Sequence, residues 1–183
     1  METTNRIIDS NGIKMHIAEA GQGPLVILCH GFPELGYSWR HQLTALAEAG
    51  YHAVAPDQRG YGKTECPESI ESYKIFDLVG DMVGLVHALG EDKAVIAGHD
   101  WGSPVAWNCA LLRPDLFHAV VLLSVPYAQR TWTGIQPTEG MKKMAGDKTF
   151  YIVYFQEPGK VEKELEEDVR KTIVSTMYSL SGD

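Results

Sequence analysis

The stretch Ala94-Val-Ile-Ala-Gly98-His99-Asp100-Trp101-Gly102-Ser103 decides how the rest of this sequence is interpreted. An apolar, β-rich run enters Gly-x-Asp-x-Gly, and a helical pattern follows it. This strand–turn–helix order is typical of a nucleophile elbow, a sharp turn whose central side chain projects above a parallel sheet. Such a turn strains the central backbone, and flanking glycines let backbone pass backbone. We therefore expect the Asp100 carboxylate to face a pocket at the start of a helix.

An aspartate at the centre of this turn has two interpretations. Its carboxylate is ionised at neutral pH and can attack carbon directly, which gives a covalent ester. Alternatively, Asp100 only caps the following helix, because Asp is a favoured N-cap residue. The two glycines and the preceding strand favour the nucleophile. A serine esterase is disfavoured, since Ser103 lies outside the Gly-x-Asp-x-Gly motif.

A second motif follows the wholly apolar run 25–29 and reads His30-Gly-Phe-Pro-Glu34. In hydrolases with a nucleophile elbow, the loop after this strand supplies one N–H group of the oxyanion hole, and the residue after the nucleophile supplies the other. We expect these donors to be the backbone N–H groups of Phe32 and Trp101. His30 is interpreted as a buried loop histidine that bonds to the backbone.

Short β-rich runs alternate with helical patterns over about the first 125 residues, which predicts an α/β fold with a mostly parallel sheet. Six strands are expected, at 6–9, 14–20, 25–29, 51–56, 94–97 and 119–124. Helices are expected over 39–49, 75–89 and 102–112. Asn11-Gly12 predicts a hairpin turn between the first two strands. Asp57 and Arg59 follow the fourth strand and are interpreted as structural, in an ion pair or in turn hydrogen bonds.

The composition changes near Pro126, which predicts two domains, 1–125 and 126–183. The first would hold the sheet. The second is polar, then aromatic, and then carries one long charged helix expected over 161–180. Because ligands of open α/β sheets bind at the carboxyl ends of the strands, we expect the second domain to be a partial helical lid over that edge.

Composition also narrows the function classes. The 183 residues contain 16 Lys and Arg against 24 Asp and Glu, a net charge of −8. Such a chain is a poor binder of nucleic acid or anionic membrane, and no apolar run approaches the roughly 20 residues that cross a bilayer. Cys29, Cys66 and Cys109 share no metal-binding spacing. We expect no metal, no cofactor and, without a signal peptide pattern, a cytoplasmic location.

The motifs in this order resemble the α/β-hydrolase-fold epoxide hydrolases. The resemblance rests on His30-Gly-x-Pro33, Asp57-x-Arg-Gly-Tyr-Gly62, Gly98-His-Asp-Trp-Gly102 and the lid-like segment Tyr151-Ile-Val-Tyr-Phe-Gln-Glu-Pro-Gly159. It implies a small-molecule epoxide substrate and an α/β-hydrolase fold. Asp100 would open the epoxide and form an alkyl-enzyme ester, and the Tyr151 phenol would polarise the epoxide oxygen. Tyr154 and Phe155 would line the apolar part of the pocket.

Two alternatives stay open beside this interpretation. Haloalkane and haloacetate dehalogenases share the elbow aspartate, which there displaces a halide. The chain could also be a non-catalytic, truncated family member that binds a ligand.

The positions of the histidines carry a further expectation. In these hydrolases the nucleophile precedes the acid and then the histidine, but His118 is the last of the seven histidines, and no strand pattern follows Ser124. We therefore expect a chain that is truncated relative to the family. It would form the ester and stall, because losing base catalysis costs about 10²–10⁴-fold in rate. We also expect self-association through the apolar edge of the last strand.

Overall fold

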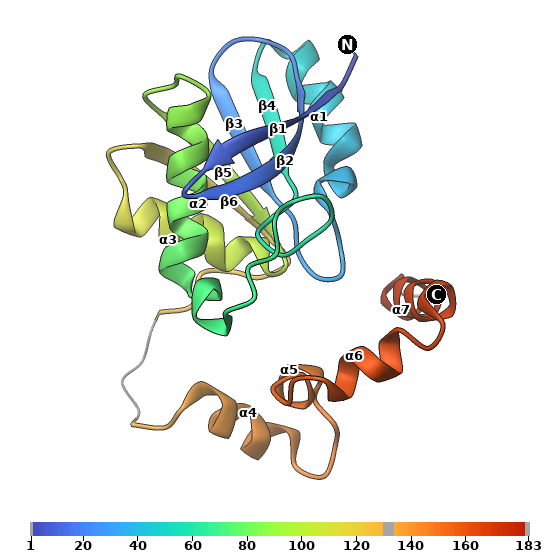
Figure 1. Cartoon of the computed structure of the whole chain (residues 1–183). Helices are drawn as coiled ribbons and strands as arrows, with labels where there is room; N and C mark the ends of the chain where they lie inside the picture. The colour runs from blue at the N-terminus through green and yellow to red at the C-terminus, as the bar shows by residue number, and fades with distance from the viewer. Residues whose placement is uncertain (1, 130–133, 182–183) are drawn as a thin grey trace. The chain divides into compact units, whose positions relative to one another are not determined.

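The computed structural model describes residues 2–129 and 134–181. It divides into two compact units, Met1–Ala128 and Gln129–Asp183 (Figure 1). The boundary falls near Pro126, where the sequence changes character. No helix in the two described ranges is long and apolar enough to cross a membrane.

The first unit is built on a six-stranded sheet with the strand order β1-β2-β4-β3-β5-β6. The strands are β1 (Thr4–Ser10), β2 (Ile13–Ala20), β3 (Leu25–Cys29), β4 (His52–Pro56), β5 (Ala94–His99) and β6 (Phe117–Leu123). β2 pairs antiparallel with β1 and with β4, and the other neighbours are parallel. The expected α/β fold is confirmed, and every strand except β3 differs from the expected one by one or two residues at one or both ends.

The hairpin between β1 and β2 turns at Asn11 and Gly12, as predicted. Their φ angles are +48° and +79°. Two consecutive residues with positive φ are what a two-residue turn needs to match the right-handed twist of its strands. Asn11 is one of the few residue types besides glycine that reach this conformation at low cost.

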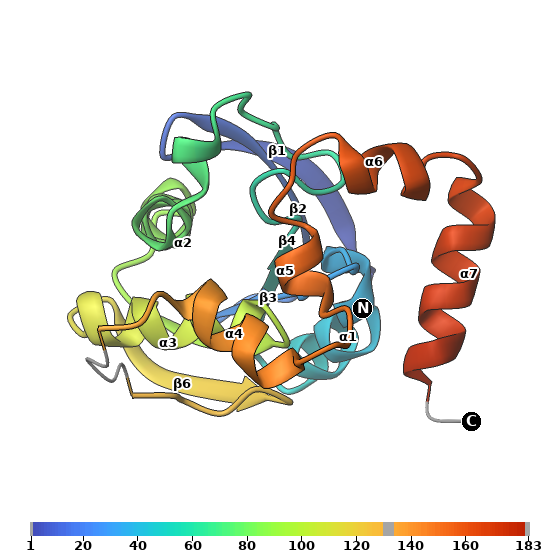
Figure 2. The ribbon, with the colours of Figure 1, turned by 90° about the horizontal axis from the view of Figure 1, so that it is seen from below.

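Helices cover both faces of the sheet (Figure 2). The 3₁₀ turn η1 (Gly36–Trp39) and α1 (Arg40–Glu48) lie on one face, while α2 (Ile75–Ala88) and α3 (Gly102–Leu112) lie on the other. A second 3₁₀ turn, η2 (Ile70–Tyr73), precedes α2. Two separate hydrophobic clusters result, one on each face.

Strand β3 shows why this sheet is covered twice. Leu25 and Ile27 belong to the cluster under α2 and α3, while Val26 and Leu28 belong to the cluster under α1. Side chains alternate between faces along a strand, so an uninterrupted apolar run predicts burial on both sides. Full burial of each large side chain contributes about 1.5–3 kcal/mol to the stability of the fold. Strand β3 is therefore held firmly in the sheet, and it fixes the start of the loop that follows it.

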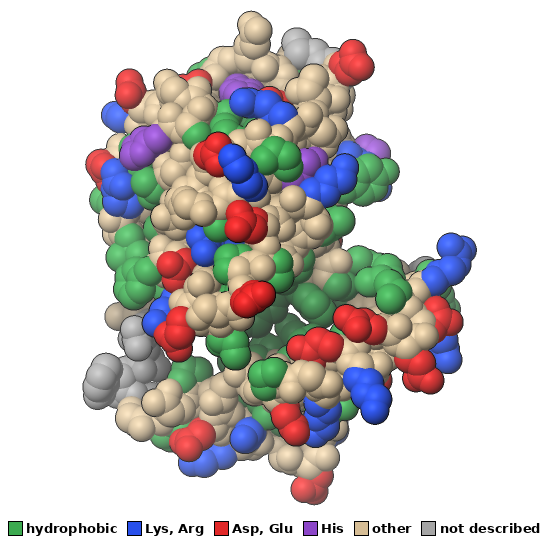
Figure 3. All heavy atoms as spheres, viewed as in Figure 1, with side chains coloured by type: hydrophobic (Ala, Val, Ile, Leu, Met, Phe, Trp, Pro, Cys, Tyr) green, Lys and Arg blue, Asp and Glu red, His purple; other side chains and the backbone are tan. Residues whose placement is uncertain are grey.

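The second unit contains α4 (Pro137–Ala145), α5 (Tyr151–Tyr154), α6 (Lys160–Leu165) and α7 (Val169–Leu180). Acidic and basic side chains lie interspersed on this unit (Figure 3). The expectation of one long helix over 161–180 is wrong, because the helix stops after Leu165. Asp168 begins a new helix there: its carboxylate accepts a hydrogen bond from the Lys171 N–H at 2.9 Å, which satisfies one donor of the first turn.

Candidate active site

The turn between β5 and α3 has the geometry of a nucleophile elbow. Asp100 has φ +51°, a left-handed conformation that is unusual for a residue with a side chain. A Cβ atom at Gly98 would collide with the backbone of Gly102, and one at Gly102 would collide with the backbone of Cys29 and His30. Both glycines are therefore required because backbone passes directly against backbone at this turn.

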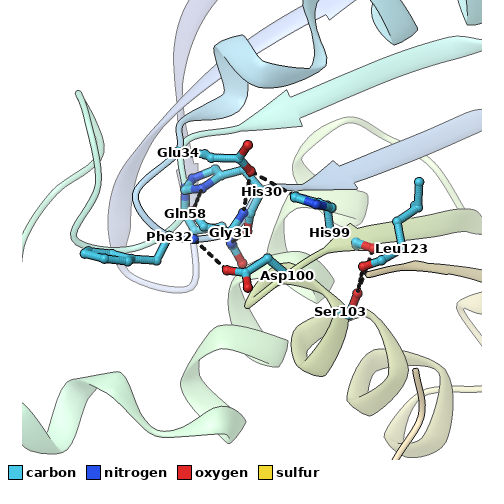
Figure 4. A network of polar contacts seen from close by, with 10 residues as sticks. His30, Gly31, Phe32, Glu34, Gln58, His99, Asp100, Ser103 and Leu123 are labelled. Atoms are coloured by element: carbon cyan, nitrogen blue, oxygen red, sulfur yellow. Dashed lines mark hydrogen bonds and ion pairs between the residues drawn. The ribbon is translucent and has the colours of Figure 1, made fainter. Parts of the chain in front are cut away.

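The Asp100 carboxylate faces the loop after β3 (Figure 4). Its Oδ1 accepts a hydrogen bond from the Phe32 N–H at 3.0 Å. A side chain at Gly31 would collide with Oδ1 and Cβ of Asp100, so the loop backbone lies directly against the carboxylate. The structure thus brings together Asp100 and the Phe32 N–H, which the sequence placed in one site. Trp101, the other expected donor, follows Asp100 and is 42% exposed.

A histidine–glutamate pair joins the same two loops. Nδ1 of His99, the last residue of β5, lies 3.1 Å from Oε2 of Glu34, and the Gly31 N–H donates to the same oxygen at 3.4 Å. Glu34 was not predicted to have a role and appeared only as the last residue of the motif His30-Gly-Phe-Pro-Glu34. The signal in the sequence that could have indicated a role is its position three residues after Gly31, which is the spacing of a tight turn. In the structure, the Glu34 N–H closes that turn by donating to the Gly31 carbonyl oxygen at 3.1 Å.

His30 is buried and bonded to the backbone, as predicted. Its Nε2 accepts from the Gln58 N–H at 3.0 Å, so Nδ1 carries the proton and donates to the Gly31 carbonyl oxygen at 2.8 Å. Burial lowers the pKa of His30, because a buried charge is costly. Both ring nitrogens are therefore engaged in holding the loop.

Asp57 and Arg59 are structural, as predicted, but they do not pair with each other. Asp57 accepts from the Gly36 N–H at 2.9 Å and lies 2.8 Å from Nδ1 of His16. Arg59 forms a buried two-bond ion pair with Asp81 of α2, at 2.9 and 2.6 Å. These contacts fix the loop after β4 beside the loop after β3.

Two other polar residues weighed from the sequence, Ser103 and His118, lie at opposite ends of β5 and β6. Ser103 is buried, and its hydroxyl donates to the Gly98 carbonyl oxygen at 2.8 Å. His118 lies near the start of β6, whose first residue pairs with Ala94 at the start of β5, so it lies at the opposite end of the strands from Asp100. Across the described part of the chain, no group of three or more His, Cys, Asp or Glu side chains could hold a metal ion.

The remaining predicted site residues lie on α5 and directly after it, in the second unit. Tyr151 is 40% exposed, and its ring packs edge-on against Phe150 and Phe155, with centroids 5.4 and 5.7 Å away. The Tyr154 hydroxyl donates to Oε2 of Glu164 at 2.8 Å, a bond that raises the pKa of Tyr154. The phenol of Tyr154 is thus held within its own unit.

The fold and the elbow together define a class of protein. Residues 24–149 match the model of the alpha/beta hydrolase fold family, and the chain belongs to that family. It is 51% identical over 172 residues to epoxide hydrolase A of Mycobacterium tuberculosis, a match that covers 93% of this chain and 53% of that protein. It is also 51% identical over 157 residues to epoxide hydrolase 3 of Siraitia grosvenorii, covering 86% of this chain and 49% of that protein.

Solved structures of epoxide hydrolases are also similar to this chain. The crystal structure of an epoxide hydrolase from Vigna radiata matches with a TM-score of 0.91 and 49% identity, over 96% of this chain and 54% of the other. An epoxide hydrolase from an endophytic Streptomyces matches with a TM-score of 0.88 and 54% identity, over 92% of this chain and 50% of the other. The chain spans about half the length of these relatives.

Proposed function

We propose that this chain carries the nucleophile of an epoxide hydrolase and that Asp100 is that nucleophile. The observation that carries the proposal is the Asp100 carboxylate, held in a strained turn with its Oδ1 bonded to the Phe32 N–H. The high identity to epoxide hydrolases supports the substrate class.

The proposed step is the opening of the three-membered ring. A carboxylate oxygen of Asp100 forms a bond to a ring carbon, and the bond from that carbon to the ring oxygen breaks. The electron pair stays on the oxygen, which takes a proton from a neutral acid. We propose the Tyr151 phenol for this role, since a phenolic hydroxyl is a neutral hydrogen-bond and proton donor. The backbone N–H groups of Phe32 and Trp101 would then stabilise the oxyanion formed when water attacks the ester. Tyr154 and Phe155 would line the apolar part of the pocket.

Hydrolysis of that ester requires a base to activate water. No histidine follows Tyr151 in the 183 residues, and His30 is held by two backbone bonds. We therefore expect the polypeptide of this sequence to react once and keep the ester, as base catalysis contributes about 10²–10⁴-fold.

Incubation with styrene oxide tests this proposal. We expect intact-mass spectrometry to show one addition equal to the whole mass of the epoxide, because ring opening expels no group. Peptide mapping should place it on Asp100, with no accumulating diol. A folded protein without an adduct would contradict the nucleophile, and steady diol production would contradict the stalled ester. Substitution of halide from a bromoalkane, with no epoxide adduct, would favour a dehalogenase.

The experiment needs a variant of the protein that lacks the one exposed thiol, because a thiol would compete with Asp100 for the epoxide. Cys66 is exposed, whereas burial raises the pKa of Cys29 to about 12 and also raises that of Cys109. Since the thiolate is the reactive form, Cys66 is the cysteine that an epoxide would modify, and the experiment should be run with the Cys66→Ser variant.

All three cysteines are free thiols, which supports the proposed cytoplasmic location.

We also propose that β6 mediates self-association. Val120, Val121 and Leu123 are 40%, 49% and 40% exposed, so apolar groups are open on both faces of this last strand of the sheet. An exposed apolar edge strand is a template for pairing with another chain.

Val121→Lys should therefore lower the association seen by sedimentation velocity. A charge on an edge strand opposes pairing, and the exposure of Val121 keeps the cost to folding small. Ile70→Lys, at a 74% exposed position in η2, is the matched control and should associate like the unmodified chain. A monomeric unmodified chain at every concentration would refute the proposal.

A further inference from the structure

We propose that Glu34 and His99 form a positioning pair that holds the Phe32 N–H against the Asp100 carboxylate. This inference rests on the proposed role of Asp100, and it explains what keeps the Phe32 N–H aligned with the Asp100 carboxylate. Neither side chain is proposed to touch the epoxide.

The pair links two loops that come from different strands. Glu34 lies in the loop after β3, and His99 ends β5 immediately before Asp100. One oxygen, Oε2 of Glu34, lies 3.1 Å from Nδ1 of His99 and accepts from the Gly31 N–H at 3.4 Å (Figure 4). A single carboxylate therefore contacts both the residue before the proposed donor, Phe32, and the residue before the nucleophile.

The loop is held on two sides. On the buried side, the Gln58 N–H of the loop after β4 donates to Nε2 of His30, whose Nδ1 donates to the Gly31 carbonyl oxygen within the loop. On the more open side, the Glu34–His99 pair joins it to the elbow. Removing Glu34 would leave His30 and Gln58 in place, so we expect the loop to persist but to lose its alignment with Asp100.

The exposure of the two side chains indicates whether the pair mainly affects the stability of the fold or the reaction rate at Asp100. The side chains of His99 and Glu34 are 36% and 23% exposed, and ion pairs that contact water contribute little to stability. A displacement of a reacting group by about 1 Å, by contrast, can cost about 10²-fold in rate. We therefore expect the pair to affect the rate at Asp100 far more than it affects unfolding.

The test is the rate of Asp100 alkylation by styrene oxide, followed by intact mass over time and over epoxide concentration in the Cys66→Ser background. Glu34→Ala should lower the maximal rate about tenfold or more, because the Asp100 carboxylate loses its alignment, and it should leave the half-saturating concentration unchanged. Glu34→Gln keeps an acceptor for both partners and should recover most of the rate. Asp115→Ala, which removes one partner of the exposed Arg113–Asp115 pair, is the matched control.

A second readout reports the geometry without any reaction. Amide hydrogen exchange, measured by NMR, should show the Phe32 N–H protected in the unmodified chain and less protected in Glu34→Ala, but not in Asp115→Ala. If the unmodified chain alkylates and Glu34→Ala alkylates equally fast, the positioning pair is refuted and the proposed function stands. If the unmodified chain forms no adduct, the proposed function fails, and unchanged Phe32 exchange in Glu34→Ala then refutes the pair.

Discussion

Asp100→Asn should abolish the styrene oxide adduct in a chain that still folds. The neutral amide oxygen is a far weaker nucleophile than a carboxylate, so ring opening should stop. Asn has nearly the same shape, keeps an oxygen that can accept from the Phe32 N–H, and tolerates positive φ well. We therefore expect an unchanged circular dichroism spectrum and a similar melting temperature, together with complete loss of the Asp100-linked mass.

The matched control for this substitution is Asp92→Asn, which makes the same chemical change at an exposed position before β5. This variant should form the adduct at the unmodified rate. An adduct of equal yield on Asp100→Asn, mapped to any other residue, would show that the elbow carboxylate is not the nucleophile.

The second large effect is expected on stability. Asp81→Ala should lower the free energy of unfolding by about 3–5 kcal/mol, because it leaves Arg59 buried without its partner. Asp81 is fully buried, Arg59 is 6% exposed, and Asp81 also accepts from Asn11 at 3.0 Å. The guanidinium cannot escape the penalty by losing its proton, because arginine stays protonated in proteins even without an acidic partner. Urea denaturation followed by circular dichroism measures the change.

Two further variants test whether the loss of stability comes from the unpaired buried charge. Asp115→Ala breaks an ion pair whose partners both contact water, and we expect little change from it. Replacing both buried partners, with Arg59→Met and Asp81→Leu together, should recover much of the loss, because no buried charge then remains. Equal midpoints for Asp81→Ala and Asp115→Ala would show that the buried pair does not hold the loop after β4 to α2.

The features that could be predicted are those whose cause lies within a few residues. Asn11-Gly12 predicted the hairpin because only certain residues adopt positive φ at low cost. The apolar run of β3 predicted a strand covered on both faces. The single helix expected over 161–180 was wrong for an equally local reason. Helical periodicity continues past Glu166, but the Asp168 side chain caps a new helix. Periodicity alone does not reveal a cap that interrupts a helix.

The partners of charged residues could not be predicted, because they depend on chain segments far apart in the sequence. Arg59 was expected in an ion pair or turn, yet its partner Asp81 lies on α2, 22 residues further along. Glu34 and His99 are separated by 65 residues. Nothing in either local pattern specifies such a pairing, since the order of β4, β3 and β5 in the sheet determines which loops meet.

The sequence by itself determined the elbow: Gly98 and Gly102 are demanded by backbone passing backbone, and that steric requirement is written in Gly-x-Asp-x-Gly. Only the tertiary structure decided that the Phe32 N–H, 68 residues away, bonds to the Asp100 carboxylate. The reason is physical. Backbone conformation at a tight turn depends on local sterics, whereas a hydrogen bond between two loops depends on the parallel pairing of β3 with β5 that carries both loops to one edge.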